Sequence, residues 1–393
     1  MIQICAIPAN LSETNISHNS VTLSWDDTNN SGNYEIQFGT SNFTLGSGTI
    51  LNSDKKSITI SNLEPNTSYD YYVLSLCDVN NSSMVSSVKT FTTATPPVST
   101  EFRATLSEMN LYIGQLKNLE PNNKTFEYEL TSSLFTDYAY KQRLIALPPG
   151  TSMTFTGNGL PDFPDDTVIS KTFYYNTDDR NESAGKTIIE TRLLILKNGI
   201  WEMANYKWNS EQTEATLDYE GGNIAINYIN IDGDSKNVNY KIPTNQDCFT
   251  CHTNADVVYP IGPKLRSMNF IVNGVNQLQQ LTNRDLLTGL NDPATVAVLP
   301  NWQDQSNTLN QRARAYFDIN CAHCHSSGGS CDDRSALELK YETEFENTGI
   351  TISKGAIKGY TSFYNPGVSM PLIGTSMVHQ EGYALIEAYV NSL

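Results

Sequence analysis

The first quarter of the chain alternates apolar and polar positions, as half-buried β-strands do. Residues 21–25 and 34–38 each place every second side chain on an apolar face. Clusters of Asp, Asn, Ser and Gly separate such segments and supply turns. The Ser/Thr/Pro-rich segment 92–97 has no apolar periodicity, which is typical of a linker. The pattern therefore predicts an all-β domain over residues 1–97.

Strand-like segments continue beyond this linker. Residues 170–175, 187–196, 201–203 and 223–228 are rich in Ile, Leu and aromatic side chains, and Gly/Asn/Asp turns separate them. We therefore predict a second, β-rich domain over residues 98–242.

After residue 242 the apolar period becomes that of α-helices. Segments 273–287, 309–319 and 378–393 repeat apolar side chains at helical spacing. The predicted fold class is therefore multidomain, with an all-β domain, a β-rich domain and a mainly α-helical module over residues 243–393.

The charge balance narrows the function. Lys and Arg number 25 against 42 Asp and Glu, so the 393-residue chain carries a formal net charge of −17. Such a chain repels phosphate backbones and anionic membranes, which argues against a nucleic-acid or lipid-surface role and favours a basic protein partner. No apolar run approaches the about 20 residues of a membrane-spanning helix, so we expect no transmembrane segment.

Four of the seven cysteines lie in two copies of a Cys-x-x-Cys-His motif. In c-type cytochromes two such thiols bond covalently to haem, and the adjacent imidazole ligates the iron. Zinc is the alternative, but it does not explain why His follows the second Cys in both copies. The sequence therefore predicts two covalently attached haems c. The motifs consist of Cys248, Cys251 and His252, and of Cys321, Cys324 and His325.

The N-terminal segment resembles a fibronectin type III domain. Trp25 on the second predicted strand and the run from Leu63 to Tyr69, which matches a tyrosine corner, carry the resemblance. It implies a β-sandwich with Cys5 at the start of the first strand and Cys77 at the end of the sixth. We expect a disulfide between them, which would suit an oxidising compartment.

Residues from about 104 to 393 resemble a bacterial family of dihaem c-type cytochromes of largely unassigned function. The resemblance implies an exported protein that handles electrons, with haem 1 bound by about 243–306 and haem 2 by about 307–393. The matching stretches are 134–141, 147–150, 171–175, 189–194, 320–325 and 369–374.

The second motif further resembles a class I cytochrome c, in which a Met before the last helix is the distal iron ligand. This resemblance makes His325 the proximal ligand and Met370 the distal ligand of haem 2. Met377 is the competitor, but it lies at the start of the predicted helix rather than on the loop before it.

The distal ligand of haem 1 stays open. Met268 is the only thioether near His252 in sequence, and it either ligates the iron or packs in a core. His379 and an open or water-ligated iron are further alternatives. His323 lies between two haem-bonded cysteines, where tethering should keep it from the same iron, so it is assigned no role.

Several polar residues of the second domain are embedded among aromatic side chains. We interpret Glu190 and Arg192, which alternate on one face of a predicted strand, as part of a cross-strand ion-pair ladder; a ligand pocket is the alternative. Cys331 has no partner left and is expected to be an unpaired thiol. The polar set comprises Asp137, Tyr138, Lys141, Arg143, Glu190, Arg192 and Trp208.

These features favour an electron-transfer protein with a redox partner. One alternative is a dihaem oxidoreductase, peroxidase- or oxygenase-like, with an open haem 1. Another is a binding protein whose β-domains contact an extracellular polymer or cell surface. The first five residues lack the basic and apolar regions of a signal peptide, so we expect a trimmed form of a periplasmic, surface or secreted protein.

Overall fold

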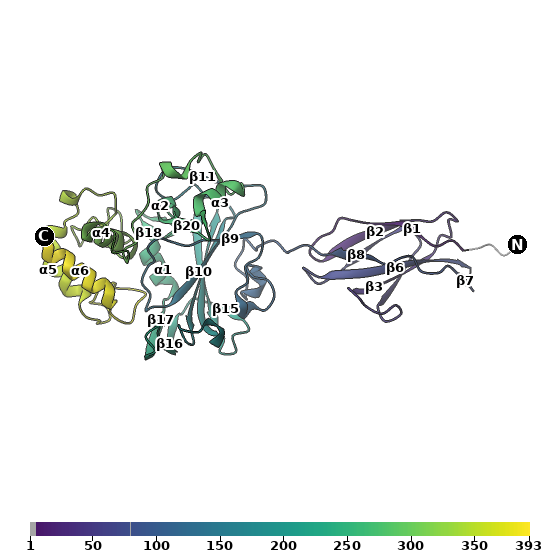
Figure 1. Ribbon diagram of the computed structural model, residues 1–393, viewed down its shortest axis with the longest axis horizontal. Helices are drawn as coiled ribbons and strands as arrows, with labels where there is room; N and C mark the ends of the chain where they lie inside the picture. Colours follow the sequence, from purple (N-terminus) through teal and green to yellow (C-terminus); the bar gives the residue numbers. More distant parts are fainter. Residues whose placement is uncertain (1–4, 79) are drawn as a thin grey trace. The chain divides into compact units, whose positions relative to one another are not determined.

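The structure is a computed structural model that describes residues 5–78 and 80–393. The chain divides into two compact units, residues 1–97 and residues 98–393 (Figure 1). The β-rich segment 98–242 and the helix-containing segment 243–393 thus lie in one unit.

Two antiparallel sheets form the first unit and enclose one core. Within that core, Trp25 packs edge-to-face on Tyr34 with ring centroids 5.2 Å apart. Tyr69 accepts a hydrogen bond from the backbone N–H of Glu64 at 2.9 Å, as in a tyrosine corner. One sheet has the order β1 (Ala9–Thr14), β2 (Ser20–Asp26), β5 (Ser57–Ser61), and the other β4 (Thr49–Ser53), β3 (Tyr34–Thr40), β6 (Ser68–Asp78), β7 (Asn81–Ser82), with β8 (Lys89–Thr92) also on β6.

The predicted disulfide is confirmed. Cys5 and Cys77 are bonded, and their Cα atoms lie 5.9 Å apart. The bond joins the segment before β1 to the end of the long strand β6, and it closes a loop between residues that are 72 positions apart in sequence.

A six-stranded antiparallel sheet organises the second unit. Its central strand β13 is buried on both faces: Leu194 and Leu196 point to one core, whereas Leu193 and Ile195 point to another. The alternation follows from the two-residue period of a strand. The sheet order is β15 (Ala215–Asp218), β14 (Ile200–Trp208), β13 (Lys186–Lys197), β12 (Val168–Asn176), β10 (Tyr140–Ala146), β9 (Thr125–Glu127).

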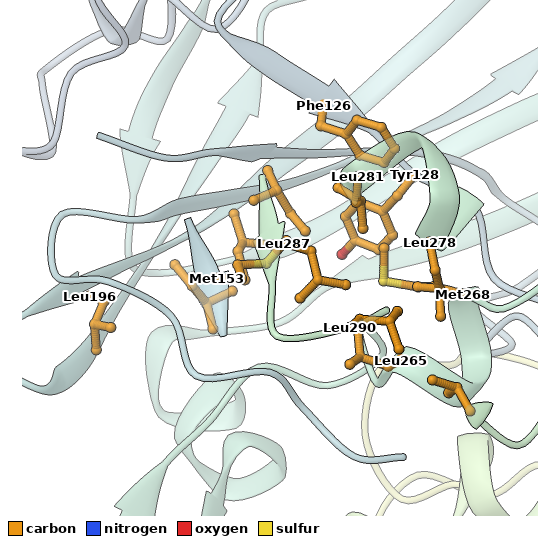
Figure 2. Close-up of a cluster of buried hydrophobic side chains, with 14 of the residues drawn as sticks. Phe126, Tyr128, Met153, Leu196, Leu265, Met268, Leu278, Leu281, Leu287 and Leu290 are labelled. Atoms are coloured by element: carbon orange, nitrogen blue, oxygen red, sulfur yellow. The ribbon is translucent and has the colours of Figure 1, made fainter. Parts of the chain in front are cut away.

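Short helices cover the face with Leu194 and Leu196. Figure 2 shows Met268 within this cluster together with Tyr128 and Leu278. The helices are α1 (Asn245–His252), α2 (Leu265–Met268) and α3 (Gln277–Asn283), and the paired strands nearby are β16 (Gly222–Ile229) with β17 (Ser235–Ile242), β11 (Met153–Thr154) with β22 (Leu287–Thr288), β18 (Thr253–Asn254) with β19 (Val257–Val258), and β20 (Ile271–Val272) with β21 (Val275–Asn276).

The remaining helices α4 (Leu309–Asn320), α5 (Ile350–Thr361) and α6 (Gln380–Ser392) group at the C-terminal end of the unit (Figure 1). Their apolar faces share one buried cluster, to which α4 contributes Phe317 and α6 contributes Tyr389. Among the described residues, no helix is long and apolar enough to cross a membrane.

Candidate cofactor site

The first motif lies on α1. Thr244 caps this helix, since its hydroxyl accepts a hydrogen bond from the Asp247 N–H at 3.2 Å. Strand β17 precedes this helix, and the two cysteines of the motif lie within the helix. The helix contacts β14, and Cys248 packs against the cluster that contains Met268.

The histidine of this motif is held in its neutral form. Nδ1 of His252 donates to the Tyr259 carbonyl at 2.9 Å, which leaves Nε2 with a free lone pair. Burial lowers the pKa of His252 to about 3, so the imidazole stays unprotonated at neutral pH. This is the state that a metal ligand requires.

The second motif directly follows α4, whose N-terminus is capped by Thr308. Cys321 packs against the cluster of the C-terminal helices. Nδ1 of His325 lies 3.2 Å from the Ser335 hydroxyl, and burial lowers the pKa of this imidazole as well. Both motif histidines thus have one nitrogen engaged and the other available.

The two motifs face each other. Sγ of Cys251, Sγ of Cys324 and a ring nitrogen of His323 all lie within 4.8 Å of one another. A hydrogen bond with Cys251 lowers the pKa of the Cys324 thiol and raises that of its partner. Cys251 and Cys324 are 73 residues apart in sequence, and the fold brings their side chains together at the centre of the site.

Backbone contacts tie the segments that follow the two motifs. The Ala255 N–H donates to the Gly328 carbonyl at 2.8 Å, and the Asn254 side chain donates to the Ser327 carbonyl at 2.9 Å. Gly328 has φ of +79°, and a Cβ there would meet the Ala255 nitrogen at 3.0 Å. Glycine permits both the backbone conformation and the close approach.

A cavity opens between the motifs and the sheet. His252 lines one part of it, Asn320 and His323 line another, and Pro371 and Ile373, on the loop that carries Met370, complete it. The cavity measures about 90 Å³. The thiol and imidazole donors that line it are of the kind that hold haem, and the cavity itself is smaller than a porphyrin.

Four cationic side chains lie at or beside this cavity, of which Arg143 is buried and the other three are half-buried. Lys171 and Arg192 line it, and Lys141 and Arg143 lie beside them on β10. Burial, together with the cations Arg143 and Lys141, lowers the pKa of Lys171 well below its ordinary value. No hydrogen bond or ion pair to the Lys171 ammonium is found among the described residues. Arg192 and Arg143 pair with Glu190 and Glu129, so Lys171 is the cation that offers unpaired positive charge to an anionic group in the cavity.

Glu190 and Arg192 form an ion pair with each other, which differs from the predicted cross-strand ladder. The two side chains form it within β13 rather than across two strands, and Glu190 also accepts a hydrogen bond from Tyr240 at 2.7 Å. Arg192 also lines the cavity, so the ion pair forms part of the cavity wall and the two interpretations of these residues are compatible.

The structure separates the candidate distal ligands. Met268 is 1% exposed in the core and is not among the residues that line the cavity of His252, which favours its packing role. Met203 and His323 reach that cavity instead. Met370 is half-buried on the loop before α6, and its N–H donates to the Tyr360 carbonyl at 2.8 Å.

The two remaining alternatives are engaged elsewhere. Met377 packs against the cluster around Tyr175 and Tyr240. His379 stacks on Phe135 with ring centroids 4.1 Å apart, beside a larger cavity of about 1000 Å³.

Lys171 and His323 were missed by sequence reasoning, because only the folded chain brings β12 and the second motif to the first.

Comparison with known proteins defines the first unit. The family model described as fibronectin type III domain matches residues 6–91, so the chain is a multidomain protein with an N-terminal fibronectin type III sandwich. No curated protein matches the chain.

Solved structures that match the chain cover about a quarter of it. A computationally redesigned β-sandwich protein is 26% identical, covers 23% of this chain and 97% of its own, and has a TM-score of 0.21. The FN5 domain of Drosophila Lar is 18% identical (23% and 98% covered, TM-score 0.21), and the fn3 domain of human contactin 1 is 16% identical (22% and 76% covered, TM-score 0.20).

Proposed function

We propose that this protein is an extracytoplasmic dihaem c-type cytochrome that transfers electrons to or from a partner protein. The observation that carries the proposal is the pair of Cys-x-x-Cys-His motifs, each with a half-buried neutral imidazole and both facing one junction. Bound haem would supply a one-electron ferric/ferrous couple at each motif.

The chain's own residues would hold the two groups in distinct ways. Cys248 and Cys251 would attach haem 1, and His252 would ligate its iron through Nε2. For haem 2 the corresponding residues are Cys321, Cys324 and His325, with Met370 as distal ligand.

The cations beside the cavity support the same assignment. Haem carries two carboxylates, and Lys171 lines the cavity beside the first motif without an ion-pair partner among the described residues, next to Arg192, which pairs with Glu190. Pairing with these carboxylates would compensate the cost of burying the cations.

Two features support the location and the partner. The Cys5–Cys77 disulfide suits an oxidising compartment outside the cytoplasm. A formal net charge of −17 would attract a basic redox partner and raise the rate of encounter.

Mass spectrometry of the full chain matured in a host that attaches haem c tests the proposal. Two haem adducts are expected, and Cys251→Ala and Cys324→Ala should each weaken one attachment. Cys331→Ala is the matched control, since this thiol lies outside both motifs, and it should retain both adducts. Correctly exported protein without any haem adduct would overturn the proposal.

One observation favours a second candidate. Cys251, Cys324 and His323 also form a thiolate–imidazole set of the kind that holds zinc. Stoichiometric zinc in exported protein that carries no haem would establish this alternative.

A further inference from the structure

The His323 side chain lies at the junction of the two motifs. It lies between Cys321 and Cys324, so attachment of both thiols to haem 2 prevents its ring from reaching that iron. Its ring nitrogen lies within 4.8 Å of Sγ of Cys324 in its own motif and also of Sγ of Cys251 in the first motif. It also lines the same cavity as His252.

The His323 imidazole has a buried nitrogen that lacks a partner. No described residue forms a hydrogen bond with its Nδ1, which is buried. His252 and His325 differ, because each has its Nδ1 within hydrogen-bond distance of an oxygen. A buried imidazole nitrogen without a hydrogen bond is costly, and a metal ion bound at this lone pair would remove that cost.

The other donors near this cavity are less suitable. Met268 lies in the core outside the cavity lining. Met203 does line the cavity, but it belongs to the same hydrophobic cluster on β14 and packs there at 7% exposure. Lys171 lies among other cations, where an anionic partner is needed.

We infer that His323 is the sixth ligand of haem 1, supplied by the motif that binds haem 2. The inference rests on the proposed dihaem function and specifies it. His252 and His323 would then make haem 1 a bis-histidine site, whereas haem 2 has a Met ligand and the higher potential. The residue after His323 is Cys324, the thioether of haem 2, so one peptide unit connects a ligand of one haem to the attachment point of the other.

The arrangement closes haem 1 to external ligands and places the haems edge to edge. The sulfur atoms of Cys251 and Cys324, which would each bond to a haem edge, lie within 4.8 Å of each other. Two closed irons with adjacent edges suit electron transfer rather than peroxidase-like chemistry, which needs an open coordination position.

The haem-loaded full chain tests this inference by electron paramagnetic resonance and near-infrared magnetic circular dichroism. These spectra distinguish bis-histidine from histidine–methionine iron. The wild type should show one low-spin haem of each kind. His323→Ala should convert one of the two haems, the bis-histidine one, to a high-spin form that binds CO, and added imidazole should restore the low-spin signal. His323→Met should replace the bis-histidine signal by a second histidine–methionine signal.

Met268→Leu and Met203→Leu are the controls, since both conserve core volume. Two covalent haems with unchanged spectra in His323→Ala would overturn the inference while leaving the dihaem function intact. Loss of the haem 1 signal in Met203→Leu, with wild-type spectra in both His323 variants, would also overturn it. A chain without covalent haem would instead refute the proposed function itself.

Discussion

Replacing Gly328 by Ala should loosen the junction between the two motifs. At φ of +79° an L-residue pays a backbone penalty, on the order of 1–2 kcal/mol. The new Cβ would also meet Asn254 Oδ1 at 2.8 Å and the Ala255 nitrogen at 3.0 Å. The Asn254 side chain can rotate away, but the Ala255 backbone can move only if its 2.8 Å hydrogen bond to the Gly328 carbonyl is disturbed.

Losing the two hydrogen bonds that join these segments adds about 0.5–1.5 kcal/mol each. We therefore expect Gly328→Ala to lower the free energy of unfolding of the second unit by roughly 2–5 kcal/mol. Gly274 is the matched control: its φ is +82°, and no atom lies within 4 Å of an added Cβ. Gly274→Ala should cost the backbone penalty alone, on the order of 1–2 kcal/mol.

Denaturant unfolding of the haem-loaded full chain, followed by haem absorption, measures both variants. The backbone penalty is common to both variants, so the difference between their losses of unfolding free energy gives the contribution of the close approach at Gly328. Equal destabilisation of the two variants, within about 0.5 kcal/mol, would show that the approach at Gly328 contributes nothing to stability.

Four further results are expected. Replacing Cys5 and Cys77 by Ala should lower the free energy of unfolding of the first unit by about 4 kcal/mol, since the disulfide closes a separation of 72 residues, and calorimetry of the full chain measures it. Met370→Ala should remove the methionine–iron signal of haem 2 and lower its potential in a redox titration. Lys171→Met should lower the potential of haem 1, because a nearby cation favours the reduced, less positive iron. Burial lowers the pKa of His379 to about 4, so the unfolded state binds its proton more tightly and the second unit should lose stability as the pH falls from about 6.5 to about 4.

Each of these results has a control variant or an outcome that would contradict it. Lys89→Met removes an exposed charge from the first unit and should leave both potentials unchanged. His379→Gln should flatten the acid dependence, and an unchanged pH profile in this variant would assign the effect to other groups. An unaltered methionine–iron signal in Met370→Ala would remove this residue from haem 2, and an unshifted transition without Cys5 and Cys77 would contradict the loop-entropy argument.

Local sequence determined the parts of this protein that depend on neighbouring residues. The strands of the first domain follow from two-residue alternation, and Trp25 and Tyr69 mark its sandwich because their spacing matches one fold. The Cys5–Cys77 pair followed from the same sandwich. The two Cys-x-x-Cys-His motifs were likewise visible at once, since haem attachment needs its thiols and imidazole within five residues.

Only the tertiary structure decided how the site is assembled. His323 was assigned no role because reasoning along the chain considered only its own motif, yet the fold turns it toward Cys251. Lys171 and Arg192 come from different strands and meet the first motif only because α1 packs on the same sheet. Met268 is close to His252 in sequence but lies in the core. The spacing of residues within a motif predicts which of them act together. The burial and direction of each side chain, by contrast, depend on contacts between segments that are far apart in the chain.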